Sequence, residues 1–467
     1  MTKTIPLTDL LVHWLPQQRW FGSKGRPIAG VSVAQQVRLV DGGHTLDHLL
    51  VDVAFDAGDT ETYQLLLGTR DQLPPRLEHA TIGALEDEIV YDAAHDSELT
   101  HVLLQLLAGE RAEGPLRFGR LSDAHIETDL TSIVMGAEQS NTSVVFGDAF
   151  IFKLFRKVAP GINPDLEITR ALAEAGNEEI VPPLAWMQTG WPGLASRDGG
   201  DHGAETTLGM LQPFVTSATE GWALAATSVR DLYAEGDLHA DEVGGDFAGE
   251  SERLGAATAH VHATLARVLP TATSSVDDNV ATAQQMQARL DTALAVVPEL
   301  TPHADALRSA FADVAALPAG VPMQRIHGDY HLGQVLRADT GWLLLDFEGE
   351  PARPLAERRA LMSPLRDVAG MLRSFDYAAR HLLAEQPGAA HLAYRAGEWA
   401  ERNRGAFCDG YAAAAGRDPR DDAVLLRALE IDKAIYEVVY EARNRPTWLP
   451  IPLGSIERLA ADDERRR

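Results

Sequence analysis

Apolar and polar residues alternate with a period of two along the first third of the chain, as they do in strands that bury one face. In "LLVDVAFDAGDTETYQLLLG" the apolar positions Val51, Val53 and Phe55 run into "DAGD", and the apolar run resumes at Tyr63. This arrangement is typical of a hairpin. With a strand in "GVSVAQQVRLVDGG" and a helix in "LTDLLVHWL", residues 1–90 are predicted to form a small meander with a helix packed on it.

A second β-rich segment centres on "EQSNTSVVFGDAFIFKLFRKV", where Gly147 and Asp148 separate two β-prone runs and predict a tight hairpin. The alternation of strand faces places Lys153 among apolar neighbours. Because most lysines in strands extend to solvent, Lys153 points to a function only in combination with other residues.

A helical pattern follows in "GINPDLEITRALAEAG", with Asn163 as a suitable N-cap and Gly176 as a stop. Glu167 lies in the first turns of this helix, where an acidic side chain also compensates the helix dipole. Helical periodicity dominates from about residue 215, and short strands and loops interrupt it over 325–350. The pattern as a whole predicts an α+β protein.

Composition and charge narrow the possible partners. The chain has 467 residues with 45% hydrophobic and 23% charged residues, and a single cysteine, Cys408, which excludes an internal disulfide. The formal charge of −27 argues against binding to nucleic acid or to an anionic membrane, so an anionic ligand needs a local cationic pocket. No apolar run approaches the roughly 18 residues of a membrane span, and we expect a cytoplasmic protein.

The strongest chemical signal lies in "RIHGDYHLGQVLRADTGWLLLDFEGE". Asp329 is followed five positions later by Gln334, and Asp346 comes directly after a buried strand. Carboxylates at the end of a buried strand are costly to desolvate unless a cation or a substrate proton engages them. With Lys153 and Glu167 these residues are the components of a phosphoryl-transfer site.

Each component has an expected role. Lys153, paired with Glu167, holds nucleotide phosphates, and Asp329 takes the proton of the acceptor hydroxyl. Gln334, Asp346 and Glu348 offer the hard oxygen ligands that Mg²⁺ prefers. ATP is therefore the expected co-substrate and Mg²⁺ the expected cofactor.

Two other classes of protein are compatible with parts of this segment. The string "HGDYH" is half of a metal-dependent hydrolase site, but His260 and His262 are two positions apart on a predicted helix and point to different faces. A catalytically inactive nucleotide-binding module is the other alternative, although both aspartates are present. We expect His327 to be structural and leave the role of His331 open between structure and substrate contact.

Stretches over nearly the whole chain resemble the actinobacterial maltokinases, relatives of the aminoglycoside phosphotransferases. The resemblance implies a bilobal protein-kinase-like fold with a cystatin-like β-rich cap over 1–90, an intermediate subdomain over 91–210 that completes the N-lobe, and a mainly helical C-lobe over 211–467. The stretches that carry it include "QQRWFGSKGRPI", "GINPDLEITRAL", "HGDYHLGQVL", "LLLDFEGEPARPLAERRALMSPLRDVAG" and "DKAIYEVVYEARNRPTWLPIPL".

The resemblance implies phosphorylation of maltose by ATP at the anomeric hydroxyl, which gives maltose 1-phosphate for glycogen or α-glucan synthesis from trehalose. It also suggests trehalose synthase as a partner. It assigns Asp329 as the base, Gln334 and Asp346 as magnesium ligands, and Lys153 with Glu167 as the phosphate-binding pair. A kinase for another sugar or an aminoglycoside-like acceptor, such as glucosamine, is the alternative.

The chain departs from the wider kinase pattern where a glycine-rich loop is expected. The segment "SNTS" precedes Lys153 instead, so the phosphates would be held by Ser140, Asn141, Thr142 and Ser143. A sugar site needs hydrogen-bonding groups and an aromatic face. The candidates for it, besides His331, come from the segment 436–450 and are Tyr440, Glu441, Arg443 and Trp448.

Overall fold

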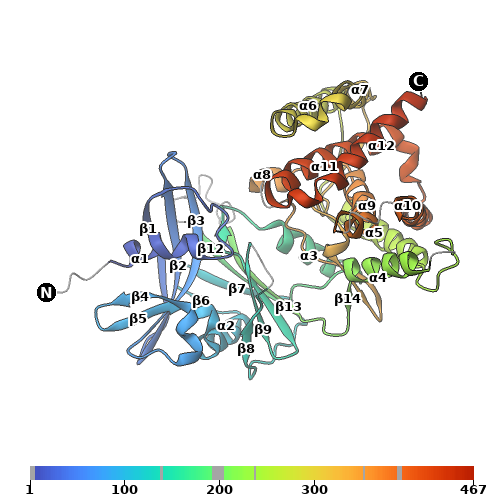
Figure 1. The fold of residues 1–467 in the computed structure, drawn as a ribbon. Helices are drawn as coiled ribbons and strands as arrows, with labels where there is room; N and C mark the ends of the chain where they lie inside the picture. Colours follow the sequence, from blue (N-terminus) through green and yellow to red (C-terminus); the bar gives the residue numbers. More distant parts are fainter. Residues whose placement is uncertain are drawn as a thin grey trace. The chain divides into compact units, whose positions relative to one another are not determined.

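The computed structural model describes residues 6–136, 140–191, 205–235, 238–350, 353–385 and 392–466. By its contacts the chain divides into an N-terminal unit, 1–170 with 182–216, and a C-terminal unit, 171–181 with 217–467 (Figure 1). The N-terminal unit is rich in strands and the C-terminal unit in helices, which confirms the α+β class. The finer division at residues 90 and 210 remains a prediction.

The first sheet of the N-terminal unit is antiparallel, in the order β1-β2-β3-β5-β4, and β11 also pairs with β3. The predicted hairpin of β2 and β3 is confirmed, since Val53 pairs with Glu61. Leu11 and Trp14 of the first helix join Val51 and Val53 in one buried cluster. The bounds are α1 Leu7–Trp14, β1 Ile28–Val40, β2 His44–Phe55, β3 Thr60–Arg70, β4 Thr81–Leu85, β5 Glu88–Asp92 and β11 Lys157–Val158.

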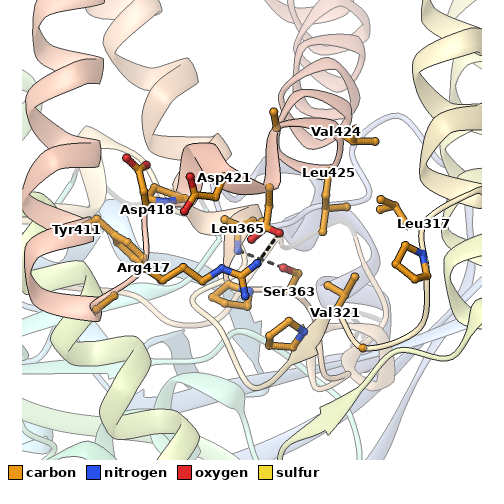
Figure 2. A pocket seen from close by; sticks show the side chains of 18 of the residues that line it. Leu317, Val321, Ser363, Leu365, Tyr411, Arg417, Asp418, Asp421, Val424 and Leu425 are labelled. Atoms are coloured by element: carbon orange, nitrogen blue, oxygen red, sulfur yellow. Dashed lines mark hydrogen bonds and ion pairs between the residues drawn. The ribbon is translucent and has the colours of Figure 1, made fainter.

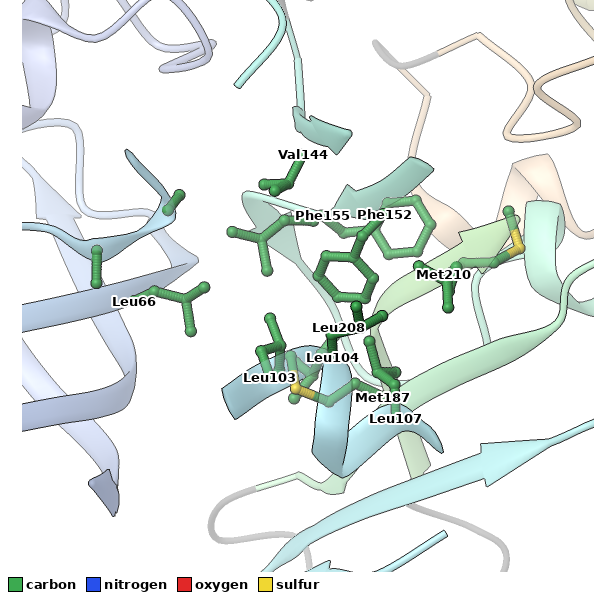
Figure 3. Packing of buried hydrophobic residues seen from close by; sticks show 14 of the residues in the cluster. Leu66, Leu103, Leu104, Leu107, Val144, Phe152, Phe155, Met187, Leu208 and Met210 are labelled. Carbon is green, nitrogen blue, oxygen red and sulfur yellow. The ribbon is translucent and has the colours of Figure 1, made fainter. Parts of the chain in front are cut away.

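The second sheet has the strand order β6-β7-β12-β13-β10-β9-β8. The predicted hairpin of β9 and β10 is confirmed, and Gly147 at its turn has φ +53°, a conformation that favours glycine. Phe152 packs with Leu103 and Leu107 of α2 in the core (Figure 3). The bounds are α2 Ser97–Gly109, β6 Ala112–Glu113, β7 Leu116–Arg120, β8 Ser132–Val134, β9 Thr142–Phe146, β10 Phe150–Leu154, β12 Ala185–Gly190 and β13 Glu205–Pro213.

The C-terminal unit consists mainly of helices around a short three-stranded sheet in the order β14-β17-β18. Helix α3, Pro164–Glu174, begins as predicted with the Asn163 side chain accepting from the backbone of Asp165, and it crosses the boundary of the units. The long helices are α4 Gly221–Ala234, α5 Ala248–Val268, α6 Val276–Val296, α7 Ala304–Ala315, α9 Leu365–Glu385, α10 Ala393–Ala415, α11 Ala423–Asn444 and α12 Pro450–Arg466. The short elements are β14 Thr219–Glu220, β15 Ala272–Thr273, β16 Pro322–Met323, β17 Val335–Ala338, β18 Gly341–Leu344 and α8 Leu355–Arg358.

None of the helices in the described part of the chain combines the length and the apolar character needed to cross a membrane.

Candidate active site

Strand β10 carries Lys153, whose side chain is mostly buried. Its Nζ atom lies 3.1 Å from Oδ2 of Asp165, in the first turn of α3, and 5.6 Å from the centre of the Phe155 ring. The lysine is thus held by a helix carboxylate, as a phosphate-binding lysine requires. Asp165 is a partner of Lys153 that the sequence did not predict, and the pairing of Lys153 with Glu167 stays a prediction.

The segment before Lys153 is mostly buried, with Ser140 exposed and Asn141, Thr142 and Ser143 inside. The hydroxyl oxygen of Thr142 accepts a hydrogen bond of 2.7 Å from Arg156. Arg156 in turn pairs with Asp92, so Thr142 serves a buried polar network of the first unit. This hydroxyl oxygen therefore has a structural task that the sequence did not indicate.

In the C-terminal unit, the loop that carries Asp329 is anchored on the buried carboxylate of Asp367 at the start of α9. This carboxylate accepts hydrogen bonds from the backbone N–H of His327 at 2.8 Å and of Gly328 at 2.9 Å, and from His262 at 3.1 Å. Burial opposes its charged form, but these donors outweigh burial and lower the pKa of Asp367. Gly370 lets α9 approach this loop, because a Cβ atom there would collide with the carbonyl oxygen of Tyr330.

Both ring nitrogens of His327 have hydrogen-bond partners. Nε2 donates to the carbonyl oxygen of Leu345 at 2.7 Å, and Nδ1 accepts from the backbone N–H of Asp329 at 3.4 Å. The ring thus ties the Asp329 loop to the end of β18 and has no free nitrogen for a metal. The Nδ1 atom of His331 likewise accepts from the backbone of Gly333, so these contacts argue against the hydrolase alternative.

Asp346 follows β18 and has φ +59°, a left-handed conformation that is strained for a residue other than glycine. Its Oδ2 atom lies 3.4 Å from Nε2 of Gln334. Glu348 is two residues further on, 3.7 Å from Arg358. The structure therefore places a carboxylate and an amide side by side near the end of one strand, and the magnesium site stays a prediction.

Lys433 on α11 is the main residue that the sequence analysis missed at this loop. Its Nζ atom lies 3.0 Å from Asp329 and 3.1 Å from Glu350. Burial disfavours the ammonium, but the two carboxylates outweigh burial and raise the pKa of Lys433. Burial likewise opposes the charged form of Glu350, while Lys433 and Arg353 lower its pKa to about 2.

A cavity of 610 Å³ opens beside Asp329 within the C-terminal unit. We call it the acceptor cavity. It has the volume of a small-molecule site. Its wall contains five aromatic rings, those of Trp222, Tyr377, Tyr436, Tyr440 and Trp448.

The buried carboxylates of the acceptor cavity have cationic partners. Glu441 forms two hydrogen bonds with Arg445, at 2.7 and 3.0 Å, and the Arg445 guanidinium lies 4.5 Å from the Trp448 ring centre. Glu437 accepts two hydrogen bonds from Arg373, at 2.7 and 3.1 Å. With Asp329 held by Lys433, each of these carboxylates has a cationic partner, although burial still raises the pKa of Glu437 despite its pairing with Arg373.

The structure brings most of the predicted acceptor residues together. Asp329, His331, Tyr440, Glu441 and Trp448 all line the acceptor cavity. The predicted Arg443 is exposed and is not among the lining residues. Arg445, two residues further along the chain, lines the cavity instead. The reason is that side chains on α11 meet the cavity at a spacing of three and four residues. Burial lowers the pKa of His331, and the Asp329 carboxylate opposes this shift.

Another cavity, of 520 Å³, lies between the loop 317–322 and the start of α11 (Figure 2). Its wall is largely apolar, and Arg417 at its edge pairs with Asp422 at 2.6 Å. None of the predicted site residues is among those that line it, so we do not assign the reaction to this cavity.

Comparison with known families gives two matches along the chain. Residues 14–96 match the maltokinase N-terminal cap domain, and residues 233–420 match the phosphotransferase enzyme family. The glucosamine kinase of Streptacidiphilus jiangxiensis is 31% identical over 334 residues, which cover 69% of this chain and 72% of the relative. The glucosamine kinase of Mycolicibacterium smegmatis is 28% identical over 330 residues, covering 69% and 78%.

Solved structures share the fold along almost the whole chain. A glucosamine kinase in complex with glucosamine, ADP and inorganic phosphate matches with a TM-score of 0.69 and 23% identity, over 98% of this chain and 99% of the other. A second crystal form of a glucosamine kinase gives a TM-score of 0.72 and 22% identity, over 98% and 100%. The predicted kinase-like fold is confirmed by these matches.

Proposed function

Because this chain belongs to the phosphotransferase enzyme family, among the maltokinase-like members with an N-terminal cap, we propose that it transfers the γ-phosphoryl group of ATP to a hydroxyl group of a neutral sugar. We propose maltose as the acceptor and its anomeric hydroxyl as the group that reacts. The observation that carries this proposal is the acceptor cavity, with aromatic rings in its wall and Asp329 at its edge.

In the proposed reaction, Asp329 accepts the proton of the sugar hydroxyl while the sugar oxygen bonds to the γ-phosphorus atom and ADP leaves. Lys433 keeps the Asp329 carboxylate oriented through its 3.0 Å contact. Lys153, held by Asp165, is the proposed partner of the nucleotide phosphates. Ser140, Asn141, Thr142 and Ser143 remain the proposed phosphate-binding segment, in which the Thr142 hydroxyl accepts from Arg156 and can still donate, and Glu167 is the proposed second partner of Lys153.

Gln334, Asp346 and Glu348 are the proposed magnesium ligands. They fit this ion because the two carboxylates and the amide carbonyl of Gln334 are hard oxygen ligands, and because Gln334 and Asp346 are neighbours, with 3.4 Å between the amide nitrogen and Oδ2 of Asp346. Mg²⁺ in this place would neutralise charge on the phosphates during transfer.

The choice of a neutral sugar rests on the charge balance of the cavity. The ammonium group of an amino sugar is best held by a carboxylate that lacks another cation. Glu437, Glu441 and Asp329 are already paired with Arg373, Arg445 and Lys433. Apart from the exposed Glu220, the groups that remain are aromatic rings and uncharged hydrogen-bonding groups, which suit the faces and hydroxyl groups of a neutral disaccharide.

Glucosamine is the second candidate acceptor, and two observations favour it. The similar proteins reported above are named glucosamine kinases. Glu220, at the N-terminus of α4, is an exposed carboxylate on the cavity wall and offers a place for an ammonium group.

The test is a phosphoryl-transfer assay with ATP and Mg²⁺ against maltose, glucose, glucosamine and an aminoglycoside. We expect kcat/KM for maltose to exceed the others by more than about tenfold, equivalent to about 1.4 kcal/mol of discrimination in the transition state. A preference for glucosamine would reject the maltose assignment and retain the sugar kinase. The absence of transfer to any of the sugars would reject both.

A further inference from the structure

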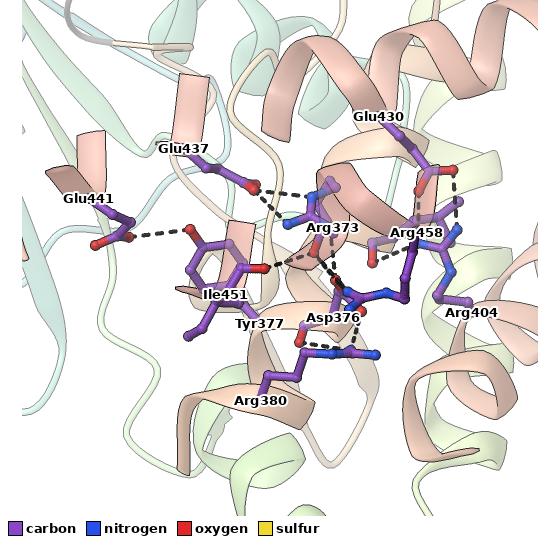
Figure 4. Close-up of polar contacts among 12 residues, drawn as sticks. Arg373, Asp376, Tyr377, Arg380, Arg404, Glu430, Glu437, Glu441, Ile451 and Arg458 are labelled. Atoms are coloured by element: carbon purple, nitrogen blue, oxygen red, sulfur yellow. Dashed lines mark hydrogen bonds and ion pairs between the residues drawn. The ribbon is translucent and has the colours of Figure 1, made fainter. Parts of the chain in front are cut away.

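The C-terminal unit contains a second polar cavity, of 500 Å³, lined by four arginines from three helices (Figure 4). We call it the arginine pocket. Arg373 and Arg380 come from α9, Arg404 from α10 and Arg458 from α12. In a chain with a formal charge of −27, such a gathering of cations is unusual and needs a reason.

The four arginines of this pocket contact three carboxylates, one of which is Glu430, the partner of Arg404 at 2.8 Å. Asp376, which is almost buried, is the shared acidic partner of Arg373, Arg380 and Arg458. Arg373 has Glu437 as a further partner, while Arg380 and Arg458 share Asp376. Three guanidinium groups thus face two carboxylates, Asp376 and Glu437, so the Asp376 end of the pocket keeps positive charge.

Two acidic residues at the rim change this balance little. Glu398 already accepts hydrogen bonds from His239 at 2.9 Å and from the backbone of Ala240 at 3.2 Å. Glu401 is exposed, where water screens its charge. The pKa of Arg380 is lowered mainly by burial. The Asp376 carboxylate raises it, whereas repulsion from the Arg458 and Arg373 guanidinium groups lowers it further, and an added anion would relieve this repulsion.

The pocket also has an aromatic edge. Tyr394, at the start of α10, lines it with 75% of its surface exposed, which is uncommon for a large ring without a partner. Exposed rings of this kind pack against the apolar face of sugars. Arginine guanidinium groups bind phosphate with paired hydrogen bonds. We propose that the arginine pocket is a second ligand site that binds a phosphorylated sugar, with the phosphate on Arg380 and Arg458 and the sugar ring on Tyr394.

Calorimetric titration of the full chain with α-D-glucose 1-phosphate, inorganic phosphate and glucose tests this site. We expect saturable binding of glucose 1-phosphate and weaker binding of inorganic phosphate, and we expect glucose to show no binding that depends on these arginines. Arg458→Gln and Arg380→Gln should each weaken glucose 1-phosphate about tenfold, the effect of losing one charge-assisted hydrogen bond. Tyr394→Ala should weaken glucose 1-phosphate and leave inorganic phosphate unchanged.

Three controls keep the result interpretable. Arg402→Gln removes an arginine of α10 that pairs with Asp246 outside the pocket, and it should bind like the wild type. Trp448→Ala perturbs the acceptor cavity and should leave this binding intact. Arg458 is partly exposed, so its variant is expected to fold, and thermal unfolding of each variant checks this.

The proposal is overturned if both arginine variants bind glucose 1-phosphate within about twofold of the wild type. It is also overturned if no saturable binding occurs, or if Trp448→Ala abolishes binding while Arg458→Gln does not, since the ligand would then lie in the acceptor cavity. Equal affinity for the two phosphates, unchanged by Tyr394→Ala, would reject the sugar. None of these outcomes depends on which sugar the enzyme phosphorylates.

Discussion

Helix α9 supplies one wall to each of two cavities that differ in charge balance. Gly370, Ser374 and Tyr377 face the acceptor cavity, where each buried carboxylate has a cationic partner, some of them shared with a second carboxylate. Arg373 and Arg380 face the arginine pocket, where three arginines share Asp376. We therefore expect ligand preference to depend on the charge left after pairing rather than on the number of ion pairs.

Arg373 links the two cavities. Its guanidinium donates to Glu437 of the acceptor cavity and to Asp376 of the arginine pocket. The two sites therefore share one buried side chain, while their remaining residues differ. Substitutions in the acceptor cavity and in the arginine pocket therefore test the two sites separately.

The largest effect is expected at the aspartate of the acceptor cavity. Asp329→Asn removes the proton acceptor, and a positioned base contributes about 10² to 10⁴ in rate. We expect kcat for the best sugar to fall by that factor, while ATP binding stays close to the wild-type value. Steady-state kinetics and a nucleotide-binding titration measure the two effects, and near-normal turnover would remove Asp329 from this role.

The aspartate of the arginine pocket should affect stability instead. Asp376→Asn leaves three arginines without their shared carboxylate, and loss of one partner of a buried ion pair costs about 3 to 5 kcal/mol in the free energy of unfolding. Burial opposes its charged form, but the three arginines lower the pKa of Asp376. Its stabilisation is thus complete above about pH 4, the usual Asp value, and declines as the pH falls further.

Urea unfolding of the wild type and of Asp376→Asn across this pH range measures that contribution. The difference between them should be largest near neutral pH and shrink below about pH 4. A difference that grows on acidification would contradict a carboxylate stabilised by these arginines.

Substitutions of Lys433 test whether its ion pair with Asp329 supports the reaction. Lys433→Met leaves Asp329 and Glu350 close together without their shared cation. We expect kcat to fall about 10- to 100-fold, because a small displacement of a catalytic group has an effect of that size. Lys433→Arg retains the charge and should recover part of the rate. A variant with unchanged kcat would show that Asp329 is oriented by other contacts.

The sequence predicted the fold elements better than the partners of the charged residues. The hairpins around Tyr63 and Lys153 follow from local alternation, which sets the strand faces directly. The link between Lys433 and Asp329 joins residues 104 positions apart, and no local pattern reveals it. A signal did exist on α11, because Lys433, Tyr436 and Tyr440 repeat at helical spacing, which predicts a common polar face.

The aromatic part of the acceptor cavity is tested by Trp448. Trp448→Ala removes a ring that lies 6.4 Å from the ring of Tyr377 and beneath the Arg445 guanidinium. We expect kcat/KM for maltose to fall about tenfold, because one aromatic contact is worth about 0.5 to 1.5 kcal/mol. Glucose, which is a smaller ligand, should lose less, and Trp448→Phe should retain most of the maltose activity. Equal losses for both sugars would show that Trp448 does not contact the second glucose unit of maltose.

The smallest expected effect is a shift in sugar preference from maltose toward the cationic sugar glucosamine. Arg445→Gln removes the cation from Glu441, which is almost completely buried, and leaves a negative charge in the wall. Glucosamine carries an ammonium group at neutral pH, so its kcat/KM relative to that of maltose should rise about threefold. Arg443→Gln is the matched control, because Arg443 is exposed two residues away and does not line the cavity. If both variants shift the ratio equally, the general surface charge is responsible; if neither does, the pairing of Glu441 does not determine which sugar is preferred.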